Sequence, residues 1–132
     1  MTAPIVYIDR SRIRPGKLSE LRDAIDDLVR YIEEREPQLI HYGFYIDEAG
    51  SRMTVIAVHP DTASVELHME VGGPAFRGFA ELIEMEGIEV YGSTSGRMLD
   101  QLNEKVAMLG EHGRVVLGDL HAGFARVGAT AR

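Results

Sequence analysis

The sequence predicts a single α+β domain whose elements follow the order strand, helix, strand, strand, helix, strand. Apolar residues recur at helical spacing in two long regions, and short strand-like runs lie between and around them. A length of 132 residues with 45% hydrophobic residues fits one globular core rather than two. Each element is supported by its own local pattern.

The first two elements have the clearest patterns. Residues 4–13 predict a strand that is apolar on both faces at its start, so both faces need to be covered. After the Pro15-Gly16 turn, a stripe at spacings of three and four predicts an amphipathic helix that ends near Glu36, before Pro37. The residues of this stripe are Leu18, Leu21, Ile25, Leu28 and Ile32.

A β-hairpin is predicted after this helix. Residues 39–47 and 52–59 are both rich in apolar and aromatic residues, and turn-forming residues at 48–51 join them. Asp61 then has the side chain and the position of a helix N-cap, which predicts a short helix as far as about Glu70.

The second half of the chain has more interruptions. Gly72-Gly73-Pro74 is expected to break the helical layer, with a further helical stretch from Ala75 to about Met85. Residues 88–92 then predict the last core strand, and residues 114–117 a short extra strand. Between them lies a third helix, capped from residues 93–95, with one apolar face formed by Leu99, Leu102, Val106 and Leu109.

This order is that of a ferredoxin-like β-α-β-β-α-β core, in which helices cover one face of a four-stranded antiparallel sheet. We expect residues 1–110 to form this domain and residues 111–132 to form a C-terminal extension. Because several strands are apolar on both sides, the uncovered sheet face would exceed the few hundred Å² of apolar patch that a monomer usually tolerates. Face-to-face pairing of two sheets in a homodimer removes this exposure.

The composition excludes several classes of protein. The chain has no cysteine, which excludes disulfides, a thiol nucleophile and thiolate metal ligands. A formal net charge of -7 disfavours nucleic acid and anionic lipid as partners, and the basic stretch from Arg10 to Lys17 fits a solvated strand face. No apolar run reaches the roughly 18 residues of a membrane span, and residues 1–7 lack a signal-peptide pattern. We therefore expect a cytoplasmic protein.

Four groups of residues resemble those of a known family. They are residues 13–17, the hairpin at 42–58, Asp61 followed by His68, and residues 123–126. In this order they resemble the antibiotic biosynthesis monooxygenase-like family of dimeric α/β barrels over nearly the whole chain. The resemblance implies a cleft between sheet and helices in each subunit, and a C-terminal segment that reaches across the dimer. Some members oxidise polyketide phenols with oxygen and no cofactor, whereas others degrade haem or have no demonstrated activity.

His68 is the first candidate for a catalytic residue. It matches the histidine that the family commonly carries in its short helix, and an imidazole can act as a general base near neutral pH. A histidine that only forms hydrogen bonds within the helix layer is the alternative. Many members carry a second histidine where this chain has Ala75-Phe76, and those that degrade haem depend on a tryptophan that this chain lacks.

Aromatic residues and one arginine complete the predicted site. Arg77 could stabilise the negative charge of an enolate or a peroxide, although a plain surface arginine fits as well. Five aromatic residues are predicted to contact a small apolar or aromatic ligand, although aromatic residues in strands also fit an ordinary core. They are Tyr7, Tyr42, Phe44, Phe76 and Tyr91.

A metal site is a further possibility. His41 and His59 lie on the two strands of the hairpin, with Glu66 and His68 not far along the chain. Their spacing matches no known metal motif, so we predict no metal and no cofactor.

Two functions remain open at the level of sequence. The first is a cofactor-independent monooxygenase of a small aromatic or quinol-type compound, with His68 as the base. The second is a non-catalytic binding or regulatory domain whose cleft holds a small apolar ligand. A purely structural dimerisation module is a third possibility, and it predicts a cleft filled by side chains.

Overall fold

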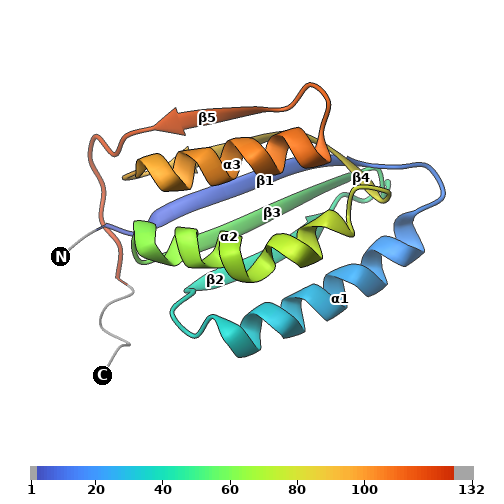
Figure 1. Ribbon diagram of the computed structural model, residues 1–132, viewed down its shortest axis with the longest axis horizontal. Coiled ribbons are helices and arrows are strands. Elements are labelled where there is room, and N and C mark those ends of the chain that lie inside the picture. The colour runs from blue at the N-terminus through green and yellow to red at the C-terminus, as the bar shows by residue number, and fades with distance from the viewer. Residues whose placement is uncertain (1–2, 127–132) are drawn as a thin grey trace.

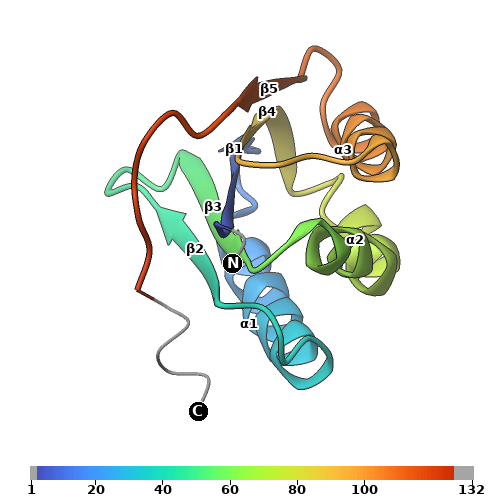
Figure 2. The same cartoon turned by 90° about the vertical axis from the view of Figure 1, so that its left-hand side faces the viewer.

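The computed structural model describes residues 3–126. These residues form one sheet with the helices on a single face (Figure 1, Figure 2). The strand order is β2-β3-β1-β4-β5, with β4 and β5 parallel and the other neighbours antiparallel. Figure 2 shows the helices on one side of the sheet and the segment after β5 on the other. The elements are β1 (Ile5–Ile13), α1 (Leu18–Arg35), β2 (His41–Ile46), β3 (Arg52–His59), α2 (Thr62–Arg77), β4 (Ile83–Tyr91), α3 (Gly96–Leu109) and β5 (Arg114–Gly118).

The predicted ferredoxin-like α+β fold is confirmed. β1, α1, β2, β3, α2 and β4 follow the expected order, and their four strands form an antiparallel sheet with the helices on one face. β5 pairs in parallel with β4 and extends this sheet to five strands, so the whole sheet is mixed rather than antiparallel. The final residues of the predicted C-terminal extension, 127–132, lie outside the described part of the chain.

The predicted break in the second helix is wrong. α2 continues through Gly72, Gly73 and Pro74 to Arg77. Two interior glycines and an interior proline disfavour a helix locally, so tertiary packing, including burial of the Phe76 side chain, accounts for the continued helix. A Cβ at position 72 would lie only 2.4 Å from the Phe76 ring, so the glycine there makes room for that ring.

The predicted helical stretch as far as Met85 is also wrong, because β4 already begins at Ile83. A β-bulge in β4, opposite Arg10 and Ser11, shifts the register of its pairing with β1. The buried positions of β4 therefore change from odd to even numbers along the strand. Period-two alternation is lost at the bulge, which explains why the sequence pattern did not predict this strand in full. The buried residues are Ile83, Met85, Ile88 and Val90.

The basic stretch in β1 is paired with acidic residues of β4. Arg10 forms an ion pair with Glu89, and Arg12 forms one with Glu84 at 3.0 Å. Both pairs lie on the outer face of the sheet, where exposed ion pairs contribute at most about 1 kcal/mol. The positive charges of this strand are thus largely matched by neighbouring carboxylates.

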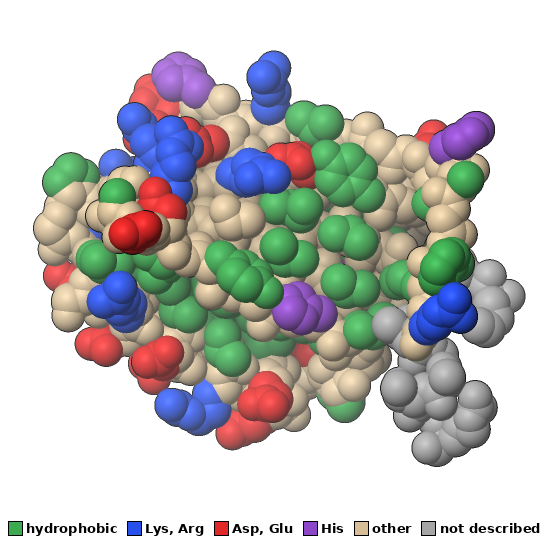
Figure 3. All heavy atoms as spheres, turned by 180° about the vertical axis from the view of Figure 1, so that it is seen from behind, with side chains coloured by type: hydrophobic (Ala, Val, Ile, Leu, Met, Phe, Trp, Pro, Cys, Tyr) green, Lys and Arg blue, Asp and Glu red, His purple; other side chains and the backbone are tan. Residues whose placement is uncertain are grey.

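Hydrophobic side chains gather in the middle of the outer sheet face, with charged side chains toward its margin (Figure 3). In this face Val6 lies opposite Val58, and Ile8 opposite Ile56. The predicted homodimer stays a prediction, and this face is the surface it requires. None of the helices in residues 3–126 has the length and apolar character needed to span a bilayer. The exposed apolar residues on this side include Tyr45, Tyr91, Val116, Leu120 and Phe124.

Candidate acid–base site

A small cavity lies between the sheet and the helices. Its wall is mostly apolar and aromatic, and the charged side chains of Asp9 and Lys105 also contribute to it. The centre of a water molecule can move within about 20 Å³ of this cavity, and a single water needs roughly 10–15 Å³ by the same measure. This volume has room for one or two water molecules but not for an aromatic ring.

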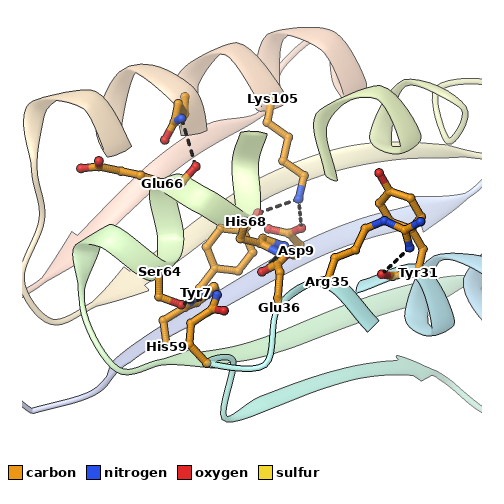
Figure 4. A network of polar contacts seen from close by, with 12 residues as sticks. Tyr7, Asp9, Tyr31, Arg35, Glu36, His59, Ser64, Glu66, His68 and Lys105 are labelled. Carbon is orange, nitrogen blue, oxygen red and sulfur yellow. Dashed lines mark hydrogen bonds and ion pairs between the residues drawn. The ribbon is translucent and has the colours of Figure 1, made fainter. Parts of the chain in front are cut away.

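Lys105 joins Asp9 and Tyr7 inside the protein (Figure 4). Its Nζ donates to Tyr7 Oη at 2.6 Å and to Asp9 Oδ2 at 2.9 Å. Asp9 is 3% exposed, Lys105 is 7% exposed and Tyr7 is fully buried. Replacing such a buried ion pair by apolar residues is often neutral or stabilising, so stability alone does not account for it. A buried pair at a cavity is a candidate functional site.

Both charges occupy core-facing positions of their elements. Asp9 alternates along β1 with Tyr7 and Ser11, which also face the helices. Lys105 lies on the buried stripe of α3, so its methylene chain packs in the core while its ammonium group reaches the cavity. The other residues of this stripe are Met98, Leu102, Val106 and Leu109.

Asp9 also has an unused hydrogen-bond acceptor. Its Oδ1 is buried and has no partner in the described part of the chain. Burial, and after it the Asp9 charge, raise the pKa of Tyr7 well above its usual range, so Tyr7 is a protonated phenol at neutral pH. Lys105 Nζ lies 4.0 Å from the centroid of the Phe76 ring, in a cation–π contact. The site therefore combines a free carboxylate oxygen, an ammonium group and a phenol.

His68 is completely buried beside this cluster and contacts Glu36. Its Nδ1 lies 3.0 Å and 2.9 Å from the two carboxylate oxygens of Glu36, which follows the end of α1. Burial lowers the pKa of His68 and raises the pKa of Glu36 to about 7. Its Nε2 has no hydrogen-bond partner among residues 3–126. The imidazole is thus neutral at pH 7 and is a weaker base than an exposed histidine.

His59 is a second buried histidine nearby. Its Nδ1 lies 2.7 Å from Ser64 Oγ, which also accepts a hydrogen bond from Gln38 at 3.1 Å. Burial lowers the pKa of His59 to about 3. The His59 and His68 ring centroids are 5.3 Å apart. Both histidines are therefore neutral parts of the interior at neutral pH.

Aromatic rings surround His68 and line the cavity. The centroids of Tyr42 and Phe76 lie 5.1 Å and 5.4 Å from that of His68. Phe44 meets Tyr42 edge-on at 5.1 Å between centroids. The structure thus brings Tyr42, Phe44, Phe76, His68 and Tyr7 into one region, with the first three in the cavity wall.

Two residues of the predicted site lie elsewhere. Arg77 is exposed at the end of α2, where it lines a surface groove between α2 and α3. Tyr91 is 42% exposed on the outer sheet face, and its hydroxyl donates to Glu89 at 2.7 Å. Neither side chain belongs to the wall of the internal cavity.

Asp9, Lys105 and Glu36 are not among the site residues predicted from the sequence. A usable signal existed for the first two, since each places a charge on the apolar face of its element and the two charges are opposite. Such a pair of charges in core positions predicts a buried contact. Glu36 offers no local signal, because its contact with His68 depends on how α1 packs against α2.

The hairpin histidines do not form a metal site. His41 is exposed and lies 3.1 Å from the hydroxyl of Tyr45, whereas His59 is buried on the opposite face of the sheet. Within the described residues, no group of three or more histidine, cysteine, aspartate or glutamate side chains is arranged to hold a metal ion.

Known proteins are similar to this chain in structure. No family model and no curated protein matches it at a significant level. MupZ from Pseudomonas fluorescens superimposes with a TM-score of 0.73 over 96% of this chain and 97% of its own, at 17% identity. SnoaB, a cofactor-independent oxygenase from Streptomyces nogalater, gives a TM-score of 0.59 over 70% of this chain and 95% of its own, at 14% identity.

A third structure has the same fold. A protein from Bacteroides thetaiotaomicron, provisionally named an antibiotic biosynthesis monooxygenase, gives a TM-score of 0.58 over 67% of this chain and 85% of its own, at 16% identity. At these identities the similarity establishes the fold and not the substrate. The chain is therefore an α+β protein with an antibiotic biosynthesis monooxygenase-like fold, and the resemblance seen in its sequence is confirmed at that level.

Proposed function

We propose that this protein is a cofactor-independent oxygenase of a small aromatic, quinol-type compound. The observation that supports this most is the free, buried Oδ1 of Asp9 beside the Lys105 ammonium group at the edge of an apolar cavity. A carboxylate in this position can take a proton from the substrate, and a fixed ammonium group stabilises the anion that forms. Aromatic side chains in the wall suit an aromatic ring.

For a substrate such as an anthrone, which carries a ring methylene, the proposed reaction converts this methylene into a carbonyl group with one molecule of oxygen. The C–H bond breaks, its proton goes to Asp9, and the electron pair stays on the substrate carbon as a carbanion next to Lys105. This carbanion passes one electron to O₂, and the resulting radical pair joins in a carbon–oxygen bond. The peroxide takes the proton back from Asp9 and becomes a hydroperoxide. The second C–H bond of the same carbon and the O–O bond then break, the proton and the hydroxide leave as one water, and the carbonyl remains. Each turnover thus consumes one O₂ and releases one water.

This proposal makes Asp9, rather than His68, the base. Asp9 and Lys105 belong to the cavity wall, whereas His68 lies behind Tyr42 and Phe76 and has a lowered pKa. We assign His68 the role of a positioning residue, which keeps these two rings in place through its contact with Glu36.

Oxygen uptake with a panel of anthrones and hydroquinones tests this proposal. Asp9→Asn should lower kcat by roughly 10²–10⁴-fold, as expected for loss of a general base. Lys105→Met should also lower kcat strongly, whereas Lys17→Met, at the other lysine of the chain, should match the parent. His68→Gln should have a smaller effect than Asp9→Asn. An Asp9→Asn variant as active as the parent would reject Asp9 as the base.

A non-catalytic binding protein is the second candidate. The small volume of the cavity favours it, because no aromatic ring fits without movement of side chains. Native mass spectrometry of the purified protein should then detect a bound apolar molecule, while no member of the panel is turned over. If neither a bound molecule nor turnover is found, a structural dimerisation module becomes the better description.

We also infer a homodimer that pairs through the outer sheet face. The exposed apolar residues there continue onto the segment after β5, where Leu120 is 58% exposed and Phe124 82% exposed. Together with Val6, Val58 and Tyr91, this segment lines an open hollow. A second copy of the chain would cover both the sheet face and these side chains.

A further inference from the structure

The internal cavity and the groove between α2 and α3 share a common wall. Phe76 and Lys105 are the two residues that line both of them. Phe76 is only 4% exposed, and Lys105 Nζ lies 4.0 Å from the centroid of its ring. The space open to the centre of a water molecule is about 20 Å³ in the cavity and about 470 Å³ in the groove. The Phe76 ring therefore lies between the small cavity that Asp9 and Lys105 line and a much larger surface groove.

The helix that carries Phe76 is weakest in its last turns. Pro74 has no N–H, so the carbonyl of Glu70 lacks its helical hydrogen bond. Gly72 and Gly73 precede it, and glycine favours the helix less than the other residues do, proline excepted. Local opening of a helix requires the least free energy where hydrogen bonds and propensity are poorest.

Among the described residues, the polar side-chain contacts of α2 with other elements are made by residues 64–70. Glu66 accepts from Ser95 Oγ at 2.6 Å, His68 contacts Glu36, and Glu70 forms an ion pair with Arg97. Among the described residues, no side-chain hydrogen bond or ion pair joins 71–77 to another element. Beyond the helix the chain is held again, because Arg14 donates to the Ala80 carbonyl at 3.2 Å. The stretch of α2 without such contacts is thus short and includes Phe76, whose ring is held by apolar packing and by its contact with Lys105.

We propose that Phe76 admits the substrate to the Asp9–Lys105 site by moving toward the groove between α2 and α3, and that its ring sets the size limit for the substrate. The proposal rests on the proposed function for the identity of the substrate, but not for the route. A substrate that enters from this groove meets Lys105 first, because that residue lines the groove as well as the cavity. Gly72 leaves room for the ring in the closed position.

Chemical labelling of lysine tests this route without any turnover. Reductive methylation with formaldehyde and a borane, followed by peptide mass spectrometry, reports on Lys105 and Lys17 in the same molecule. Phe76→Ala should speed the labelling of Lys105 on the order of tenfold or more and leave Lys17 unchanged. Ile88→Ala removes an equally buried side chain away from the groove and controls for a general loss of stability. Equal acceleration in both variants would overturn the proposal.

A second variant stiffens the helix instead of opening it. A Cβ at Gly73 would meet no atom within 4 Å, so Gly73→Ala fits without strain and favours the helix. It should slow the labelling of Lys105 about fivefold. Gly96→Ala, in α3, also meets no atom within 4 Å and should leave the rate unchanged. If Gly73→Ala and Gly96→Ala give the same rate as the parent, movement of α2 does not control access.

The two proposals fail separately. Rapid labelling of Lys105 in Phe76→Ala, with no oxygen uptake by the parent on any panel member, would keep the access route and reject the oxygenase. If the parent is an oxygenase, Phe76→Ala should accept larger rings than the parent does. Oxygenase activity with the same size limit in Phe76→Ala and in the parent would reject Phe76 as the residue that sets that limit.

Discussion

At the scale of single residues, the Asp9–Lys105 pair couples stability to the proposed chemistry. The two side chains come from β1 and α3 and meet in the core at 2.9 Å. Both side chains are almost fully buried, so each charge depends strongly on the other. The unused Oδ1 of Asp9 shows that the pair is not arranged for maximal stability.

We predict that removing one charge of the Asp9–Lys105 pair lowers the free energy of unfolding more than removing both charges does. Lys105→Met leaves a buried, unpaired carboxylate and should lower the free energy of unfolding by about 3–5 kcal/mol. The double variant Asp9→Leu/Lys105→Met should recover most of that loss, and neither variant should retain activity. Denaturant unfolding at pH 7 measures the free energy of unfolding of both variants. If the losses measured for Lys105→Met and for Asp9→Leu alone simply add in the double variant, the pair is not coupled.

The buried histidines should make the protein sensitive to acid. The pKa of His59 is about 3 in the folded protein, against an ordinary value of 6.5, so the unfolded chain binds one more proton between these pH values. Above pH 6.5 the neutral His59 costs the folded protein no stability. As the pH falls from 6.5 toward 3, the free energy of unfolding decreases by about 1.4 kcal/mol per pH unit because of this residue. The lowered pKa of His68 acts in the same direction. The raised pKa of Glu36 acts in the opposite direction between about pH 4.5 and 7.

A variant isolates the contribution of His59. His59→Asn keeps a polar group near Ser64 but does not titrate in this range, so its unfolding free energy should fall less steeply between pH 6 and pH 4 than that of the parent. The expected difference in slope is about 1.4 kcal/mol per pH unit. Denaturant unfolding at several pH values measures it. Equal slopes in the two proteins would mean that His59 is not buried in its neutral form.

At the scale of elements, the sequence patterns predicted correctly those helices and strands whose main contacts are between residues close in sequence. The stripe of α1 and the β2–β3 hairpin were predicted almost to the residue, because each depends on neighbours that are close in sequence. The region from Gly72 to Gly87 was predicted poorly, because burial of Phe76 and the bulge in β4 depend on packing between distant segments.

Close packing of α3 against β4 gives a third prediction. A Cβ at Gly110 would lie 2.0 Å from the carbonyl oxygen of Met85, which is backbone and cannot move aside cheaply. Gly110→Ala should therefore push the end of α3 away from β4 and destabilise the protein by about 1–3 kcal/mol. Gly96→Ala, at the other end of the same helix, should be neutral or slightly stabilising. Equal unfolding free energies for the two variants would contradict this.

At the scale of the whole molecule, the two faces of the sheet have different roles. One face packs on α1, α2 and α3 around the acid–base site (Figure 2). The other face is apolar in its middle and carries no helix (Figure 3). An uncovered face of this kind marks an interaction surface.

We predict that a charge in the middle of the outer face disrupts the dimer. Ile8→Glu should shift the protein toward its 14.6 kDa monomer in sedimentation velocity at micromolar concentration. A dimer that pairs through this face would otherwise bury two carboxylates without partners. Leu67→Glu, at a 39% exposed apolar residue on α2, should leave the mass unchanged. A parent protein that sediments as a monomer would reject the dimer.

The sequence by itself determined the order of the elements, the fold class and the apolar character of both sheet faces, because these depend on the local periodicity of side chains. It also supplied His68 and most of the aromatic residues of the site. Only the tertiary structure decided that Asp9 and Lys105 form a buried pair, that Glu36 contacts His68, and that Phe76 lies between the cavity and the groove. Such contacts join residues far apart in the chain, and their distances are set by the packing of helices on the sheet.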